Sequence, residues 1–413
     1  MTTTAPTLTR PTSGMDPIDV SDPALFQNHT VGPLFARLRR EDPVHWCPQS
    51  RFGPYWSVTR YKDVMQVEVN HAVFSSSIEY GGITIRDQPE GYRRPSFISS
   101  DPPRHDEQRK TISPIVGPGN LAQMEALIRE RTRSVLDDLP RNQTFDWVER
   151  VSVELTTRML ATLFDFPFED RRLLTWWSDV ATADLQSGLG IDSEEKRLAE
   201  LMKCFEYFQR LWKEREAQPP RTDLVSMLAH GAATRAMAPM EFLGNVVLLI
   251  VGGNDTTRNS MSGGLHAMLT HPGEWDKLRA NPALVSSLVP EIVRWQSPVA
   301  HMRRTALADF ELGGKTIRRG DKVVMWYLSA NRDEAAIERA DEFIIDRARP
   351  RQHISFGFGI HRCVGNRLAE LQLKILWEEI LERFPRIELA GEPRRLYSNF
   401  IHGFTALPVR IPG

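Results

Sequence analysis

The segment from Phe356 to Gly365, which reads FGFGIHRCVG, constrains the fold of this chain more than any other. Its glycines permit tight backbone turns that a side chain would block, and Cys363 stands just before a strongly helical stretch. A sulfur in that place lies beside the backbone amides of a helix N-terminus, which lower the pKa of a thiol and donate hydrogen bonds to a thiolate. We therefore expect a metal-binding thiolate on a glycine-rich loop.

The loop leads into a stretch whose apolar residues occupy two faces of a helix. Leu368 and Leu371 share one face, and Leu373 and Leu376 share another. A helix that is apolar on more than one face is buried rather than amphipathic at a surface. The sequence therefore predicts a buried helix up to about Phe384.

Helical patterns dominate the chain, and short strand-like runs occur towards both ends. The strand-like runs cover Phe52–Thr59 and Phe310–Tyr327, and the second turns back at Gly313-Gly314 as a hairpin. Further helical patterns cover residues 147–164, 194–215 and 241–269. We predict a mainly α protein with small β-sheets, in the α+β class. No repeat or long linker interrupts residues 16–413, which predicts one domain after a disordered Thr- and Pro-rich arm over residues 1–15.

The chain has only three cysteines, at positions 47, 204 and 363, and no two are close in sequence. This spacing fits neither a zinc ribbon nor a secreted disulfide scaffold. One thiolate is a poor ligand set for zinc or an iron-sulfur cluster, but it is what the axial position of a haem requires. The alternative is a buried structural cysteine beside a glycine-rich turn.

The pattern Phe-x-x-Gly-x-x-x-Cys-x-Gly in this loop resembles the haem-binding signature of the cytochrome P450 family. The resemblance implies that Cys363 is the proximal ligand to the iron of haem b, and that Phe356 packs near the thiolate and tunes its potential. It also places Gly357, His361 and Gly365 at the cofactor. The implied fold is that of a P450, with the haem between a distal oxygen-binding helix and the helix that follows the cysteine loop.

The helical pattern over residues 241–269 carries Gly252 and Gly253 shortly before Asp255 and Thr256. Each interior glycine costs about 1 kcal/mol relative to alanine, so we expect something to approach this backbone closely. A small ligand such as dioxygen between helix and metal would explain the glycines, and an acid beside a hydroxyl suits controlled proton delivery. The run resembles the P450 motif Ala/Gly-Gly-x-Asp/Glu-Thr, which implies that Thr256 assists the activation of O2 and Asp255 relays protons. A glycine-kinked packing helix with a satisfied Asp-Thr pair is the alternative.

A haem also carries two propionates, which need cationic or hydrogen-bonding partners. The resemblance implies that His105 and Arg109, together with Arg304 and His361, are these partners. Arg303 could take the place of its neighbour Arg304.

Glu291 and Arg294 stand three residues apart, where side chains meet on one face of a helix. In isolation such a pair is a common surface ion pair of little energetic value. In the family the Glu-x-x-Arg pair is buried and joined by a later arginine, for which Arg347 is the best match. We expect this triad to hold the fold rather than to take part in catalysis.

The resemblance implies that Leu248, Val251, Gly252, Ala300 and Met302 contact a small apolar substrate. Their mostly apolar side chains fit an alkyl chain, although such a helix stripe is ordinary core in most proteins. The chain resembles most the bacterial P450 branch that hydroxylates terminal carbons of medium-chain alkanes and fatty acids, which is the leading hypothesis. The alternatives are hydroxylation of terpenes or aromatics, a peroxide-driven thiolate peroxygenase, and a non-enzymatic haem-thiolate sensor.

The balance of 52 basic against 53 acidic side chains does not indicate a nucleic-acid partner. Neither a signal peptide nor an apolar run of about 20 residues is visible, so we expect a cytoplasmic protein without a transmembrane anchor. No flavin or nicotinamide fingerprint is visible, so electrons from NAD(P)H are expected to arrive through a 2Fe-2S ferredoxin and its ferredoxin reductase. A basic patch including Arg362, with Arg104, Arg109 or Lys110, could dock an acidic ferredoxin, or could be only a solvated basic face.

Overall fold

The computed structural model of the protein describes residues 16–413, so the predicted N-terminal arm over residues 1–15 lies outside the described residues. The helices are α1 (Pro23–Gln27), α2 (Val31–Glu41), α3 (Tyr61–Val69), α4 (Arg104–Ile112), α5 (Pro118–Asp137), α6 (Glu154–Phe164), α7 (Arg172–Thr182), α8 (Glu194–Glu216), α9 (Leu224–His230), α10 (Pro239–Thr270), α11 (Pro272–Ala280), α12 (Val285–Gln296), α13 (Tyr327–Ala330) and α14 (Asn366–Arg383).

Within residues 16–413 the strands are short and gather in four small sheets. They are β1 (Val44–Cys47), β2 (Tyr55–Val58), β3 (Phe74–Ser75), β4 (Thr144–Asp146), β5 (His301–Ala306), β6 (Phe310–Leu312), β7 (Lys315–Ile317), β8 (Lys322–Trp326), β9 (Glu388–Leu389), β10 (Arg394–Arg395), β11 (Phe404–Ala406) and β12 (Pro408–Arg410). The largest sheet has the order β1-β2-β8-β5-β3. The α+β class expected from the sequence is confirmed.

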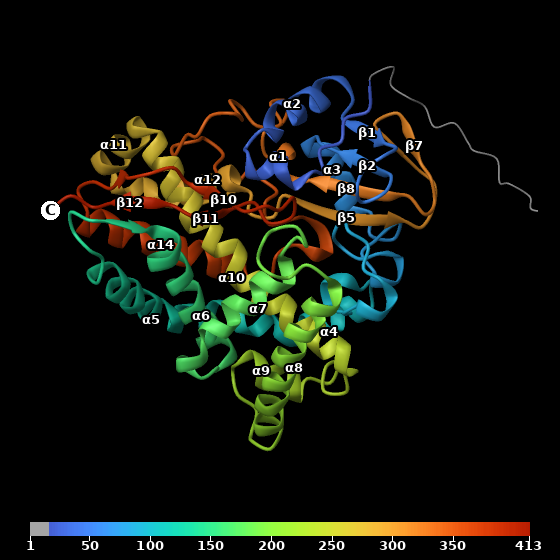
Figure 1. The fold of residues 1–413 in the computed structure, drawn as a ribbon, viewed down its shortest axis with the longest axis horizontal. Helices are drawn as coiled ribbons and strands as arrows, with labels where there is room; N and C mark the ends of the chain where they lie inside the picture. The colour runs from blue at the N-terminus through green and yellow to red at the C-terminus, as the bar shows by residue number, and fades with distance from the viewer. Residues whose placement is uncertain (1–15) are drawn as a thin grey trace, which may run out of the picture.

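Figure 1 shows the five-stranded sheet at the upper right, with α2 and α3 near it. The helices α5 to α9 form the lower part of the view, and α10 runs through the middle. Helix α10 packs against α6 and α7, which precede it in the chain, and against α12 and α14, which follow it.

The longest helix, α10, is held in place by apolar side chains at both of its ends. It begins with Pro239 in its first turn, where the missing backbone N–H costs no hydrogen bond. Leu243 and Ile250 belong to one hydrophobic cluster, and Met261 and Leu265 belong to a second. The stretch between these anchors, residues 251–260, contains the two glycines, the acid and the threonine.

Two antiparallel strand pairings lie within residues 301–326. Strand β5 pairs with β8, with Met302 opposite Met325 and Arg304 opposite Val323. The short hairpin β6–β7 turns at Gly313 and Gly314, whose φ angles of 57° and 74° are the left-handed values such a two-residue turn requires. The hairpin predicted at this Gly-Gly pair is therefore confirmed.

The helical patterns in the sequence correspond to helices of the structure, with one irregularity. The pattern over 194–215 forms α8, that over 241–269 forms α10, and that over 368–384 forms α14. The pattern over 147–164 is divided, because residues 148–153 form a π-helical turn before α6 begins. Such turns often occur where a helix is bent for a functional reason.

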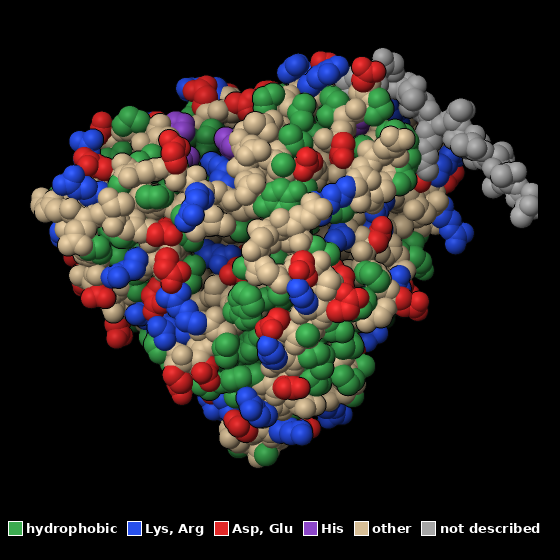
Figure 2. All heavy atoms as spheres, in the orientation of Figure 1, with side chains coloured by type: hydrophobic (Ala, Val, Ile, Leu, Met, Phe, Trp, Pro, Cys, Tyr) green, Lys and Arg blue, Asp and Glu red, His purple; other side chains and the backbone are tan. Residues whose placement is uncertain are grey.

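Charged side chains of both signs are interspersed over the face of the molecule shown in Figure 2, in line with the nearly equal numbers of acidic and basic residues. Across residues 16–413, none of the helices combines the length and apolar character needed to span a bilayer.

Candidate active site

The loop before α14 holds Cys363 by backbone contacts. The backbone N–H of Cys363 donates a hydrogen bond of 2.8 Å to the carbonyl of Phe356. Gly357 and Gly359 have φ angles of 67° and 65°, which side chains rarely adopt. A Cβ at Gly359 would lie 2.5 Å from the carbonyl oxygen of Glu68, so the loop can pack against α3 only with glycine there.

The sulfur of Cys363 lies at the N-terminus of α14, where the backbone N–H groups of Gly365 and Asn366 donate to it. Burial raises the pKa of the thiol, while these N–H groups and the positive charges of Arg109 and Arg362 oppose that shift. The side chain is deep in the molecule and yet exposed, because its exposed surface faces the cavity that it lines.

A cavity of about 350 Å³ lies between α10 and this loop. Its lining joins helix and loop residues: Leu248, Val251, Gly252, Gly253, Thr256, Phe356, Gly357, His361, Cys363 and Gly365. The hydroxyl of Thr256 donates a 2.8 Å hydrogen bond to the carbonyl of Gly252, one turn earlier in α10. The cysteine loop and the glycine segment of α10, which are about 100 residues apart in sequence, therefore face one cavity.

Gly252 and Gly253 of α10 have different neighbours. A Cβ added at Gly252 meets no atom within 4 Å, so this position leaves open space in the cavity. A Cβ added at Gly253 would lie 2.6 Å from a methyl group of Leu160, so this position allows α6 to approach α10. From the sequence, we expect a small ligand bound between this helix and the cofactor to explain both glycines; in the structure Gly253 also allows close packing of α6.

Asp255 is fully buried and does not line the cavity. Its carboxylate accepts from Arg258 at 2.7 Å and from the side-chain amide of Asn254 at 3.2 Å. Arg258 also pairs with Asp179 of α7 at 2.8 Å. Burial raises the pKa of Asp255, and the positive charge of Arg258 opposes the rise.

Thr182, at the end of α7, connects Asp255 with the cavity. Its hydroxyl lies 3.2 Å from a carboxylate oxygen of Asp255 and 3.0 Å from the carbonyl of Ser178, and its side chain lines the cavity. A hydroxyl has one proton and can accept as well as donate, so it can pass a proton between the buried acid and the cavity. No motif in the sequence marks Thr182, because α7 joins the site only through the tertiary fold.

Two predicted anchor residues, His105 and His361, form a pair of imidazoles with their ring centroids 4.3 Å apart. His361 bonds Ser76 at 2.8 Å through Nε2, and His105 bonds Asp106 at 2.8 Å through Nδ1. The other nitrogen of each ring, Nδ1 of His361 and Nε2 of His105, is buried without a hydrogen-bond partner. Burial, with the charge of Arg304 as a second cause, lowers the pKa of His361 to about 2.

The predicted anchors Arg109 and Arg304 both line the cavity. Arg109 donates to the carbonyl of Arg362 at 2.5 Å, and Arg304 donates to the buried carboxylate of Glu68 at 2.9 Å. Side chains alternate along a strand, so the neighbouring Arg303 points to the other face of β5 and pairs with Asp87. Of the two arginines that the sequence left open, Arg304 is the one at the cavity.

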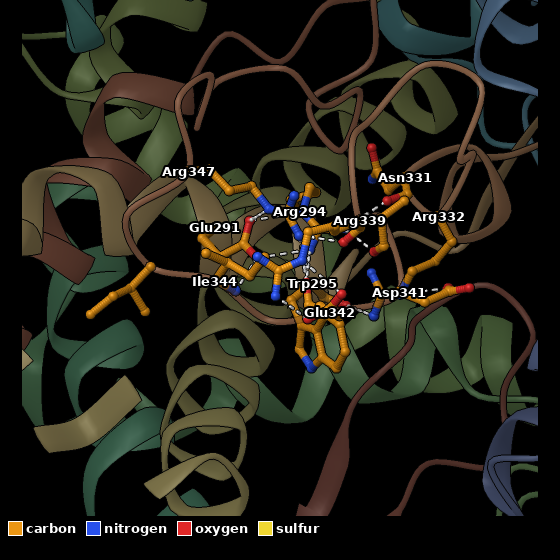
Figure 3. A network of polar contacts seen from close by, with 12 residues as sticks. Glu291, Arg294, Trp295, Asn331, Arg332, Arg339, Asp341, Glu342, Ile344 and Arg347 are labelled. Carbon is orange, nitrogen blue, oxygen red and sulfur yellow. Dashed lines mark hydrogen bonds and ion pairs between the residues drawn. The ribbon is translucent and has the colours of Figure 1, made fainter. Parts of the chain in front are cut away.

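Glu291, Arg294 and Arg347 meet in a buried network, shown in Figure 3. Arg294 donates to both carboxylate oxygens of Glu291 at 2.8 and 2.7 Å, and Arg347 donates to one of them at 3.0 Å. Arg294 also donates to the backbone carbonyls of Asn331 and Ala340 at 2.8 and 2.7 Å. The network ties α12 to the irregular segment over residues 331–347.

Met302 lines the cavity, as do Leu248 and Val251, whereas Ala300 does not. Strand β5 begins only at His301, so the alternation that places Met302 and Arg304 on the cavity side does not extend back to residue 300. The side chain of Ala300 is buried in another cluster, with Trp326. Val299 lines the cavity instead.

The segment between β10 and β11 also reaches the cavity, through Phe400 and Ile401. Ile401 forms a bridge with Val299, which brings the last part of the chain against the start of β5. The sequence offers no motif for these contacts, because they arise from the pairing of distant segments.

In the expected basic patch, Arg362 and Lys110 are exposed, while Arg104 pairs with Glu241 at 2.5 Å. The side chain of Arg109 is half-buried and turned to the cavity lining. Arg104 and Arg109 therefore contribute less free positive charge to the surface than the sequence suggests.

Comparison with known proteins shows which protein family this chain resembles in sequence and structure. The cytochrome P450 family model matches residues 44–401. The chain is 38% identical over 406 residues to the linalool 8-monooxygenase of Pseudomonas putida, covering 96% of this chain and 99% of that protein. It is 33% identical to the methyl-branched lipid omega-hydroxylase of Mycobacterium tuberculosis, covering 91% and 90%. It superposes on the structure of cytochrome P450-153 from Novosphingobium aromaticivorans with a TM-score of 0.90 and 48% identity, covering 95% and 98%.

The chain therefore belongs to the cytochrome P450 family. Its relatives are named monooxygenases, and it is an oxidoreductase of this class. The family implies a haem, dioxygen as co-substrate and external redox partners. The non-enzymatic sensor is accordingly set aside.

The residues around the cavity fit a haem. The sulfur of Cys363 is accessible and would serve as a single thiolate ligand to an iron, and the cavity has room beside Gly252. The unpartnered nitrogen of His361 and the guanidinium of Arg109, both in the cavity lining, would provide partners for acidic groups on the same molecule, and His105, which does not line the cavity, packs against the His361 ring behind them. An unpaired buried polar atom is costly, so a ligand that satisfies the imidazole of His361 is favoured.

Proposed function

We propose that this P450 hydroxylates the terminal carbon of a medium-chain alkane or fatty acid. The observation that carries the proposal is an apolar cavity that extends from Cys363 along α10 and is lined by Leu248, Val251 and Met302. Such a wall stabilises an alkyl chain by burying it, at roughly 25 cal/mol for each Å² removed from water. The likeness to a lipid omega-hydroxylase over most of the chain supports the same substrate class.

In this proposal Cys363 is the ligand of the iron of haem b, and Phe356 packs beside its sulfur. His105, Arg109, Arg304 and His361 hold the propionates. The hydrogen bonds of the α14 N-terminus stabilise the thiolate form of Cys363. When bound, the haem supplies the chemistry that activates dioxygen and inserts one of its oxygen atoms into a C–H bond.

The remaining residues position the substrate and control protons. The side chain of Thr256 presents its hydroxyl to the cavity, and Asp255 acts as the proton donor behind it, through Thr182. The absence of a side chain at Gly252 leaves space for a small molecule next to that hydroxyl. Apolar neighbours such as Leu248 and Val251 exclude water, which limits the loss of protons to side reactions.

We propose that electrons come from NAD(P)H through a ferredoxin reductase and an acidic 2Fe-2S ferredoxin, in the cytoplasm. The exposed Arg362 and Lys110, near the surface side of the cysteine loop and α4, supply positive charge for docking. Association should then weaken as ionic strength rises.

The test is turnover of dodecane and dodecanoic acid by the holoenzyme with a ferredoxin and its reductase. Terminal alcohols as the main products support the proposal, and products oxidised only at internal carbons overturn it. Thr256→Ala should consume reductant while releasing hydrogen peroxide in place of product. Thr270→Ala is the matched control, because this exposed threonine makes the same type of bond, 2.9 Å to His266, at the far end of α10. Full coupling in Thr256→Ala would remove the proton-delivery role of Thr256, and efficient turnover with peroxide alone would favour a peroxygenase.

A second candidate substrate is a terpene alcohol, which is favoured by the 38% identity with a linalool 8-monooxygenase. A binding screen that follows the haem spectrum with alkanes, fatty acids, terpenes and aromatic acids separates the two. If only terpenes or aromatics perturb the spectrum, the straight-chain assignment falls and the monooxygenase class remains.

A further inference from the structure

A guanidinium group lines the cavity without an acidic partner of its own. Arg94, in the segment before α4, lines the same cavity as Cys363 and is largely buried. Its hydrogen bond from Nη1 to the carbonyl of Tyr92 is long, at 3.3 Å. Within residues 16–413, no carboxylate lies within ion-pair distance of Arg94. A cation in an apolar cavity without a counterion is costly unless a ligand supplies one.

Glu194, whose charge acts on Arg94, and Asp184, whose charge acts on the adjacent Arg197, are already engaged with other arginines. Glu194 pairs with Arg197 at 3.0 Å and with Arg86 at 3.5 Å. Asp184 pairs with Arg51 at 2.8 Å. Three guanidinium groups therefore share these two carboxylates and Arg94 pairs with neither, so positive charge is in excess in this region.

Two further observations show that this region lacks polar partners. The Nε atom of Arg197 and the amide oxygen of Gln88 are buried without a hydrogen-bond partner, and Gln88 lines the cavity. The orientation of a glutamine amide is assigned from its partners, so Gln88 can present its NH₂ group to an acceptor instead. At the outer surface, the carboxylate of the exposed Glu195 accepts a hydrogen bond of 2.7 Å from the hydroxyl of Tyr92.

The position of Arg94 along α10 sets the length of a ligand that reaches from it to the reaction centre. The carbonyls of Arg94 and Pro95 lie against Gly244, where a Cβ would approach them to 2.9 and 2.0 Å. Gly244 precedes Gly252 by eight residues and Thr256 by twelve, which at 1.5 Å per residue is about 12 to 18 Å along the helix. With C–C bonds of about 1.5 Å, each advancing roughly 1.3 Å along an extended chain, this span holds about 9 to 14 carbons.

We propose that Arg94 binds the carboxylate of a medium-chain fatty acid and so directs the opposite, terminal carbon to the part of the cavity beside Gly252 and Thr256. This inference rests on the proposed function and narrows its substrate class from alkanes and acids to carboxylic acids. The excess of arginines stabilises the ligand's charge, and the apolar wall along α10 holds its chain. Anchoring one end of the chain also fixes which carbon lies at the reaction centre.

The experiment measures dissociation constants from the spectral change of the holoenzyme with dodecanoic acid, methyl dodecanoate and dodecane. The variants are Arg94→Gln, which removes the charge, and Arg94→Lys, which keeps it. Arg93→Gln is the matched control, because the neighbouring Arg93 does not line the cavity. In the unaltered protein we expect the acid to bind more tightly than its methyl ester.

A charge-assisted hydrogen bond in a buried site predicts that Arg94→Gln weakens binding of the acid by about 10- to 100-fold. The same change should alter binding of the ester and the alkane by no more than about twofold. Arg94→Lys should recover part of the affinity for the acid. A merely structural role predicts equal losses for all three ligands, and that result overturns the inference, as does an unchanged affinity for the acid. If the unaltered protein binds the alkane and ester but not the acid, only the carboxylate site is refuted; if it binds no straight-chain compound, the proposed function itself fails.

Discussion

The substitution Glu291→Gln tests the role of the buried triad, because it removes one negative charge and almost no volume. Glu291 and Arg294 are both 0% exposed, and Glu291 accepts from Arg294, Arg347 and the backbone N–H of Ile344. Loss of one partner from a buried ion pair costs about 3–5 kcal/mol. The amide oxygen of a glutamine can still accept a hydrogen bond, but its NH₂ group would face the N–H donors that Glu291 now satisfies.

The shift in melting temperature follows from the size of the chain. At roughly 2.1 cal/mol/K per residue, a chain of 413 residues has an unfolding entropy of about 0.9 kcal/mol/K, so the loss lowers the Tm by about 3–6 °C. The assay is thermal unfolding of holoprotein at fixed scan rate. The control is Glu338→Gln, an exposed residue of the same segment whose carbonyl, not carboxylate, contacts Arg347. A Tm change in Glu291→Gln no larger than in Glu338→Gln would refute the assignment of stability to this triad.

Two further predictions concern α10. Gly253→Ala should lower the free energy of unfolding by about 1–3 kcal/mol through overpacking against Leu160, whereas Gly252→Ala should gain up to about 1 kcal/mol of helix propensity. Chemical denaturation of both variants checks this, and equal effects would contradict the distinction. Because burial raises the pKa of Asp255 above its ordinary value of 3.8, the folded protein holds this proton more tightly than the unfolded chain. The free energy of unfolding of the unaltered protein, minus that of Asp255→Asn, should therefore fall as the pH rises from 3.8 through the pKa of Asp255 in the folded protein. If this difference in free energy stays constant or rises over that pH range, the pKa of Asp255 is not raised.

The parts of the site that sequence could predict are those in which one local segment carries both the chemistry and the backbone conformation. The cysteine loop is the clearest example. Its Gly357 and Gly359 have positive φ angles, and the sulfur of Cys363 accepts hydrogen bonds from backbone N–H groups at the start of the helix that directly follows. Likewise, Gly252 and Thr256 lie one turn apart on one helix, so helical periodicity alone brings them together.

The parts that sequence could not predict depend on where distant segments meet. The family resemblance implied that Ala300 contacts the substrate, but β5 begins one residue later, and Val299 rather than Ala300 lines the cavity. Thr182 and Arg94 have no local signature, because each is placed by the packing of its segment against α10.

The central claim is that the sulfur of Cys363 is the ligand of a haem iron. The most direct measurement is the absorption spectrum of the reduced, haem-loaded protein after addition of carbon monoxide, compared with that of Cys363→Ser. We predict the Soret shift peculiar to a thiolate ligand in the unaltered protein and its loss in the variant. Protein that takes up no haem, or a shift that persists in Cys363→Ser, would contradict the claim.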